Sequence, residues 1–140
     1  MTDPAGRVVV PIRAEADIVL VRHQVRERAV ALGFSLIEQT KLVTAASELA
    51  RNTWVHGGGG EAEVSSSARS GIACLHVVFS DTGPGIDDVE RALTDGFTTG
   101  DGLGLGLGGA RRLVDEFAID TVPGAGTRVT IRACAGRRPS

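Results

Sequence analysis

Two stretches in the first half of the chain carry apolar residues at helical spacing. In residues 15–32 they recur every three or four positions, and Gly33 follows as a stop signal. Ser35 and Glu38 form a capping box, which predicts a second helix that runs to about His56, where four glycines follow. The pattern therefore predicts two consecutive helices. The apolar positions of the first are Ile18, Val21, Val25, Ala29 and Leu32.

Alternation of apolar and polar residues predicts several strands. They cover residues 7–13, 61–67, 72–81, 118–122 and 127–133. Pro11 has no N–H to donate to a ladder, so residues 7–13 are expected to form an edge strand. The last strand has its apolar side chains on one side only, so we expect one face of the sheet to be buried and the other to face water.

Two further helices are predicted between the strands. Residues 87–95 form a short one, and a third major helix follows a glycine run. The apolar stripe of this third helix is Leu107, Ala110, Leu113, Val114 and Phe117. The order of elements predicts an α/β fold, a two-layer sandwich with helices packed on one face of a mixed, mostly antiparallel sheet. A length of 140 residues fits one domain over residues 1–140.

Composition and charge exclude several classes of partner. The chain is 42% hydrophobic and 23% charged, and its net charge of -2 provides no general attraction to nucleic acid or to an anionic membrane. No apolar run is long enough to span a bilayer, and the N-terminus lacks the layout of a signal peptide. We therefore expect a cytoplasmic protein that binds neither nucleic acid nor membrane.

The cysteines and histidines suggest no chemistry of their own. Cys74 and Cys134 are far apart in the sequence without the paired spacing of a metal or redox site, so we interpret both as small buried strand residues. His23 is interpreted as a solvated helix residue, and His56 and His76 as structural or capping residues.

Glycine is the unusual component, with 19 residues, and it is clustered rather than periodic. The pattern GxGxxG at Gly104, Gly106 and Gly109 follows a loop instead of a strand, which argues against a dinucleotide fingerprint. A P-loop is excluded because the only lysine, Lys41, lies in the second helix. A cradle for an anion at a helix start remains, with a surface loop without a ligand as the alternative.

The second helix offers a pair of polar residues one turn apart. Glu48 and Asn52 border its apolar stripe and face the same way. An amide oxygen can ligate a hard cation such as Mg²⁺, and a carboxylate can accept a proton from an attacking hydroxyl or water. The alternative is a solvated polar edge of the helix.

A third candidate lies in the sequence "SDTGPGI". Period-two alternation carries Asp81 onto the core side at the end of its strand, where a carboxylate needs donors. Gly83 and Gly85 leave room for a flat ligand, and the amino group of an adenine would be one donor. Thr127 would add a hydroxyl to the same pocket. The alternatives are a turn that Asp81 caps itself and an ordinary strand residue at Thr127.

Taken in order, "ELARN", "DTGPG" and "GLGLGL" resemble the N box and the two glycine boxes of the GHKL ATP-binding superfamily. The resemblance implies a Bergerat α/β sandwich that binds Mg²⁺-ATP under a lid at about residues 86–101. Asn52 then corresponds to the Mg²⁺ ligand, Glu48 to the general base, and Asp81 and Thr127 to the adenine contacts. The residues that match the nucleotide loops are Gly83, Gly85, Gly102, Gly104, Gly106 and Leu107.

Within this superfamily, "SELARN", "DGFTTG" and "GARRLVDEF" are most similar to bacterial partner-switching serine kinases, of the stressosome switch and anti-sigma-factor types. That resemblance implies phosphorylation of a STAS-domain antagonist or scaffold protein, with a PP2C-type phosphatase or a sigma factor as a further partner. Arg111 or Arg112 could assist Mg²⁺, although a solvated helix face is the simpler interpretation. The alternatives are a nucleotide-gated binding module with little phosphotransfer and a histidine-kinase-like catalytic domain.

Overall fold

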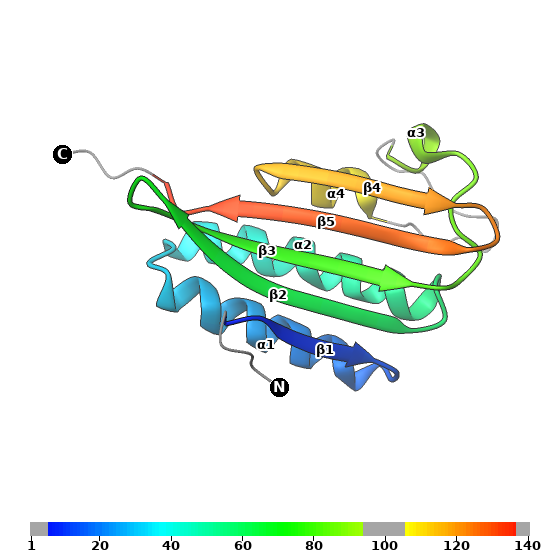
Figure 1. Cartoon of the computed structure of the whole chain (residues 1–140), viewed down its shortest axis with the longest axis horizontal. Coiled ribbons are helices and arrows are strands. Elements are labelled where there is room, and N and C mark those ends of the chain that lie inside the picture. The colour runs from blue at the N-terminus through cyan, green and yellow to red at the C-terminus, as the bar shows by residue number, and fades with distance from the viewer. Residues whose placement is uncertain (1–5, 94–105, 137–140) are drawn as a thin grey trace.

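The computed structural model describes residues 6–93 and 106–136 as two layers, a sheet and a layer of helices (Figure 1). The first part contains β1 (Val8–Ile12), α1 (Ala16–Ala31), α2 (Leu36–Val55), β2 (Gly60–Arg69), β3 (Ile72–Asp81) and α3 (Val89–Ala92). The second contains α4 (Leu107–Arg112), β4 (Glu116–Val122) and β5 (Gly126–Cys134). The predicted α/β sandwich is confirmed.

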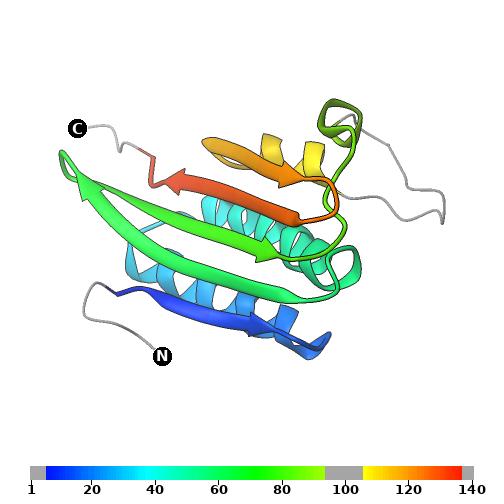
Figure 2. The same ribbon diagram turned by 45° about the vertical axis from the view of Figure 1, so that its right-hand side comes forward.

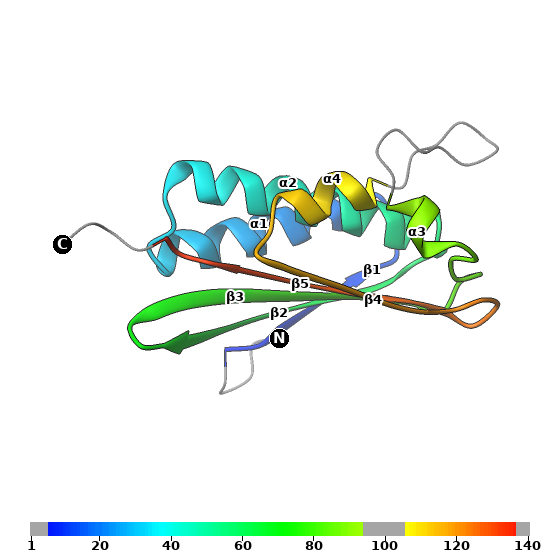
Figure 3. The ribbon, with the colours of Figure 1, turned by 90° about the horizontal axis from the view of Figure 1, so that it is seen from above.

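The sheet has five strands in the order β1-β2-β3-β5-β4. All of its pairings in the described part of the chain are antiparallel, so the expected mixed sheet is in fact antiparallel throughout. β1 is an edge strand, as Pro11 predicts. Seen from above, the helices lie on one side of the sheet and the other side is open (Figure 3).

The two long helices cover the apolar face of the sheet. α1 buries Val21, Val25 and Ala29. The capping box at the start of α2 is formed, with Ser35 Oγ accepting from Glu38 N at 3.1 Å and Glu38 Oε1 accepting from Ser35 N at 2.7 Å. The two helices therefore begin and end close to the predicted positions. No helix within residues 6–93 and 106–136 is long and apolar enough to cross a bilayer.

The third major helix of the prediction is wrong in length. α4 has only six residues, and Phe117 lies in β4, opposite Ile131 of β5. Two glycines inside α4, Gly108 and Gly109, weaken a helix by about 1 kcal/mol each. Phe117 and Ile119 also alternate toward the core along β4, so pairing with β5 prevails over the helical spacing.

The interpretation of the cysteines is corrected as well. Cys74 at the start of β3 and Cys134 at the end of β5 are direct partners in the sheet register and form a disulfide. Ala135 N donates to Ala73 O, which makes the cysteine pair a non-hydrogen-bonded position, where side chains approach most closely. Distance along the sequence did not reveal the pair because strand register brings the two residues together.

On the open face of the sheet, His76 lies near the disulfide. Its Nε2 is 2.9 Å from Ser67 Oγ. Burial lowers the pKa of His76 below 6.5, the nearby Arg132 guanidinium lowers it further, and Glu116 opposes both. Protonation of His76 therefore costs more in the folded chain than in the unfolded chain.

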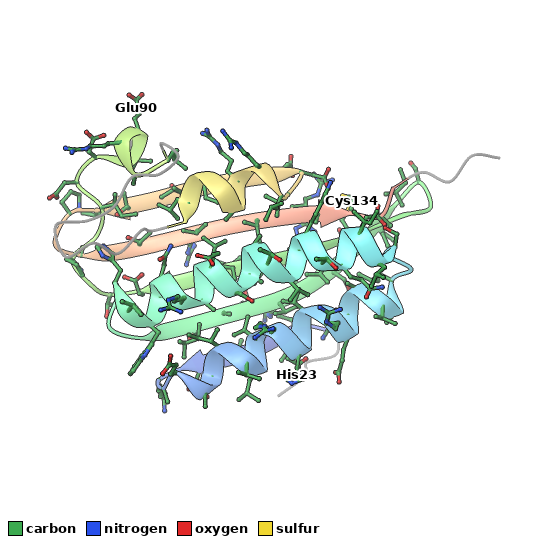
Figure 4. The ribbon with its side chains drawn as sticks, turned by 180° about the vertical axis from the view of Figure 1, so that it is seen from behind. His23, Glu90 and Cys134 are labelled. Carbon is green, nitrogen blue, oxygen red and sulfur yellow. A yellow bond between two sulfur atoms is a disulfide. The ribbon has the colours of Figure 1, made fainter. Side chains whose placement is uncertain are left out.

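This shift predicts a pH dependence of stability. An unfolded His76 gains its proton near its ordinary pKa, before the folded one does, so the free energy of unfolding should fall as the pH drops below about 6.5. His76→Gln should remove that part of the slope in urea unfolding measured from about pH 7.5 to 5. His23→Gln, on the exposed surface of α1 (Figure 4), serves as the control. Equal slopes for wild type and His76→Gln would contradict the assignment.

Candidate functional site

Four of the predicted site residues line one pocket, Asn52, Asp81, Leu107 and Thr127. They come from α2, from the ends of β3 and β5, and from the start of α4. Figure 2 turns this end of the molecule forward and shows the last turn of α2 beside the ends of β3 and β5. The apolar walls are Leu49, Phe79, Ile86 and Val129. A cleft with apolar walls and a few converging polar groups is typical of a small-molecule site.

Asp81 ends β3 on the core-facing side, as period two predicts, and is directly opposite Thr127 of β5. Its Oδ1 accepts from Gly83 N at 2.9 Å, so it does cap its own turn with one oxygen. Its Oδ2 has no hydrogen bond to any described residue. A half-buried carboxylate oxygen without a donor fits a ligand that carries an N–H group.

Glycine allows Gly57 to pack against this carboxylate and the neighbouring segments to pack against one another. A Cβ on Gly57, just after α2, would lie 2.4 Å from Asp81 Cγ and 2.5 Å from Oδ2. A Cβ on Gly83 would lie 2.7 Å from Gly57 O, and one on Gly85 would lie 2.5 Å from Val122 O. The prediction missed Gly57, which we interpreted only as a helix stop. The available signal was that four consecutive glycines exceed what a helix end requires.

Glu48 and Asn52 lie one turn apart on α2, with Glu48 exposed and Asn52 half-buried, beside the buried Leu49. Glu48 is not part of the pocket lining but adjoins it. Gly106, the residue before α4, has a φ of 66°, and a Cβ there would lie 2.6 Å from Glu48 Oε2. The end of the second glycine box therefore packs directly on the Glu48 carboxylate. Gly102 and Gly104 lie outside the described residues.

The hydroxyl of Thr121, which was not predicted from the sequence, connects residues around the pocket. Thr121 Oγ1 accepts from Ile86 N at 2.9 Å and donates to Gly126 O at 3.1 Å. Its oxygen is also 3.0 Å from Thr127 Oγ1. Because the one proton of Thr121 is committed to Gly126, the Thr127 hydroxyl donates to Thr121 and keeps its own lone pairs as acceptors. His56 Nε2, 3.1 Å from Gly85 O, joins the end of α2 to the same loop.

This arrangement predicts a moderate effect of Thr121→Val. The variant leaves Ile86 N and Thr127 Oγ1 without their partner, so we expect stability to fall by about 1–3 kcal/mol and ligand affinity to fall about three- to tenfold. Thr121→Ser should restore both properties, and Thr130→Val on the open face of β5 is the matched control. Chemical denaturation and calorimetry measure the two effects. Wild-type affinity in a folded Thr121→Val would contradict the role of Thr121.

The donor set at this end of α2 fits a magnesium ion only in part. The described residues contain no group of three or more histidine, cysteine or acidic side chains that could hold a metal. The Asn52 amide oxygen, with Glu48 one turn away, is the kind of hard oxygen ligand that Mg²⁺ takes together with phosphate oxygens and water. The fit is therefore to a metal that arrives with a phosphate ligand. Arg111 and Arg112, in the last turn of α4, are exposed.

The pocket, its acidic and amide residues and the sheet topology agree with one protein family. A family model described as Histidine kinase-, DNA gyrase B-, and HSP90-like ATPase matches residues 37–136. The chain belongs to this ATPase family. The matched range includes the α2 pair, the β3 turn and the glycine segment before α4. The predicted resemblance to the GHKL superfamily is thereby confirmed.

Relatives of this ATPase-family chain include protein kinases. The chain is 42% identical over 120 residues to "Serine/threonine-protein kinase RsbT" of Bacillus subtilis (strain 168). The aligned region covers 86% of the chain and 90% of that protein. Among solved structures, the RsbU and RsbW domains of Rv1364c from Mycobacterium tuberculosis match with a TM-score of 0.61 and 21% identity over 96% of the chain. The chain spans 33% of that longer protein.

A second solved structure, like the first, supports the fold alone. The catalytic domain of histidine kinase ThkA matches with a TM-score of 0.52 and 15% identity, covering 91% of the chain and 97% of that domain. The similarity extends to nearly all of ThkA's catalytic domain, so the helix-on-sheet arrangement is common to both.

Proposed function

We propose that the chain is an ATP-dependent serine/threonine protein kinase of the partner-switching type, and that it phosphorylates a STAS-domain protein. The observation that carries this proposal is the convergence of Glu48, Asn52 and Asp81 at one end of the sheet, with Gly106 packed on Glu48. The 42% identity to a serine/threonine-protein kinase over most of both chains supports the same reaction. Since ATP is the phosphoryl donor, we also propose a cytoplasmic location.

Each residue has a role that follows from its chemistry. Asp81 Oδ2 accepts a hydrogen bond from the exocyclic amine of adenine, and Thr127 Oγ1 adds an acceptor on the facing strand. Asn52 would hold Mg²⁺ through its amide oxygen, and the chemistry supplied there would be neutralisation of charge on the phosphates. Gly106 and Leu107 bring the backbone close to the phosphate side of the pocket.

Glu48 is the proposed general base. Its exposed carboxylate at the mouth of the pocket can accept the proton of a serine or threonine hydroxyl that a partner protein presents. Because Gly106 has no side chain, its backbone can pack against the Glu48 carboxylate without displacing it. Most of the rate would come from positioning and charge neutralisation rather than from covalent chemistry with the protein.

The test is a phosphotransfer assay with radiolabelled ATP, Mg²⁺ and a purified STAS-domain protein. We expect the label on the STAS protein to survive acid and to be lost in alkali. Phosphoserine and phosphothreonine behave in this way. Acid-labile label would instead indicate histidine phosphorylation. Binding of the STAS protein that depends on nucleotide, without transfer of label, would indicate a nucleotide-gated binding module. Either of these results would overturn the proposal.

A further inference from the structure

The Cys74–Cys134 disulfide lies at the end of the sheet opposite the nucleotide pocket. The same number of residues separates Cys74 from Asp81 along β3 as separates Thr127 from Cys134 along β5. The bond and the pocket therefore occupy the two ends of one strand pair. Figure 4 shows Cys134 beside the first turns of α2, far from the last turn of that helix. Neither cysteine is among the described residues that line the pocket.

The two cysteine residues differ in exposure and in nearby charge. Cys74 is only 4% exposed, whereas Cys134 is half-buried and more accessible. Arg132 Nη2 lies 3.7 Å from Cys74 Sγ, and the same guanidinium pairs with Glu116. On the other side, the Asp115 carboxylate accepts from Cys134 N at 2.7 Å. A cation beside Cys74 and an anion beside Cys134 favour negative charge on the sulfur of Cys74.

The neighbouring histidine does not change this asymmetry. His76 lies on the same face of β3 as Cys74, and burial lowers the pKa of His76, so it is mostly neutral at pH 7. Arg132 is thus the cation at Cys74, and Glu116 and Asp115 are the nearby carboxylates.

We propose that Cys74–Cys134 is a thiol–disulfide exchange site whose co-reactant is a dithiol, either a small molecule or a protein. A thiolate of the dithiol attacks Cys134 Sγ, the bond between the two cysteines breaks, and its electron pair stays on Cys74 Sγ beside Arg132. The second thiolate of the dithiol then attacks the sulfur joined to Cys134 and releases the Cys134 thiolate. The dithiol is thereby oxidised to a disulfide. The two protons lost by its thiol groups protonate Cys74 and Cys134, so both cysteines become thiols.

Exchange at this place would loosen one end of the fold. The disulfide links residues 60 positions apart, and the segment after it is docked by Gly136 N, which donates to Glu38 Oε2 at 2.5 Å. Glu38 also caps α2, so the C-terminal end of β5 and the start of α2 are joined here. Reduction should therefore lower stability while leaving the distant pocket unchanged. Reducing compartments, such as the one proposed for this chain, usually hold only transient or redox-sensing disulfides.

The first experiment titrates the folded, oxidised wild-type chain in buffers of reduced and oxidised dithiothreitol. We expect reversible reduction with retained circular dichroism, a melting temperature lower by roughly 10 °C, and ATP affinity within about threefold. A variant with both Cys74→Ser and Cys134→Ser should have the melting temperature of the reduced wild-type chain in every buffer. A bond that dithiothreitol reduces only after the chain is unfolded would overturn the proposal, and this result needs no variant.

The second experiment identifies the attacked sulfur. Oxidised protein is treated with glutathione and trapped at once with N-ethylmaleimide, and the peptides are analysed by mass spectrometry. We expect glutathione on Cys134 and maleimide on Cys74, and the reverse pattern would overturn the proposed direction. Arg132→Gln should slow reduction about fivefold, the effect of one charge at 3.7 Å in water. Arg128→Gln, on the same face of β5, should leave the rate of reduction unchanged. Equal rates of reduction in the two variants would show that Arg132 does not assist the step.

Discussion

Replacement of Glu48 by glutamine is expected to lower the rate of phosphotransfer at least about 100-fold and to leave ATP affinity within about threefold of wild type. Glutamine keeps the shape of the side chain beside Gly106 but cannot accept the proton of the attacking hydroxyl. Because Glu48 adjoins the pocket without lining it, binding of the base and ribose should not change. Single-turnover assays with labelled ATP, together with calorimetry, separate the two quantities.

The matched control is Glu27→Gln, which removes an exposed carboxylate from α1. It should leave both rate and affinity at wild-type values. Unchanged phosphotransfer in Glu48→Gln would show that another group takes the proton, or that the hydroxyl needs no base. Loss of ATP binding in the same variant would show instead that Glu48 supports the nucleotide, which the geometry argues against.

The α2 part of the site could be predicted from the sequence because helical geometry is local. Positions 48 and 52 are one turn apart in any α-helix, and the buried stripe beside them sets the direction in which they face. Asp81 was predictable for the same reason, since period two places it on the side of Phe79 at the end of β3. Each of these predictions needs only the residues of one element.

What the sequence did not reveal depends on the register between elements. Thr121 acts through Ile86 and Gly126, and the disulfide needs β3 and β5 aligned at a single register. No spacing along the chain encodes such a match. The error in α4 has a similar origin. Phe117 fits a helical and an alternating pattern equally well, and only its partner Ile131 on β5 decides between them.

In the proposed ATP site, specificity for the base would depend on one oxygen of the Asp81 carboxylate. Asp81 Oδ1 accepts a hydrogen bond from Gly83 N. Because Gly57 has no side chain, the space beside Asp81 Oδ2 that a side chain would fill is open. Thr127 lies directly opposite on β5. Two acceptors on neighbouring strands, beside the apolar surface of Phe79 and Ile86, suit the amino edge of a purine. The carboxylate thus favours a base with an exocyclic amine over one with a carbonyl at that edge.

Asp81→Asn is therefore expected to weaken ATP binding at least about 100-fold with little change in fold stability. The amide oxygen can still accept from Gly83 N, but the NH₂ group would then meet the adenine amine as a second donor. Calorimetry with ATP and with purine riboside triphosphate, which lacks that amine, tests the contact itself. Wild type should prefer ATP strongly, Asp81→Asn should not, and Asp120→Asn on the exposed side of β4 should behave as wild type. An unchanged preference in Asp81→Asn would refute the adenine contact, whatever the reaction the chain catalyses.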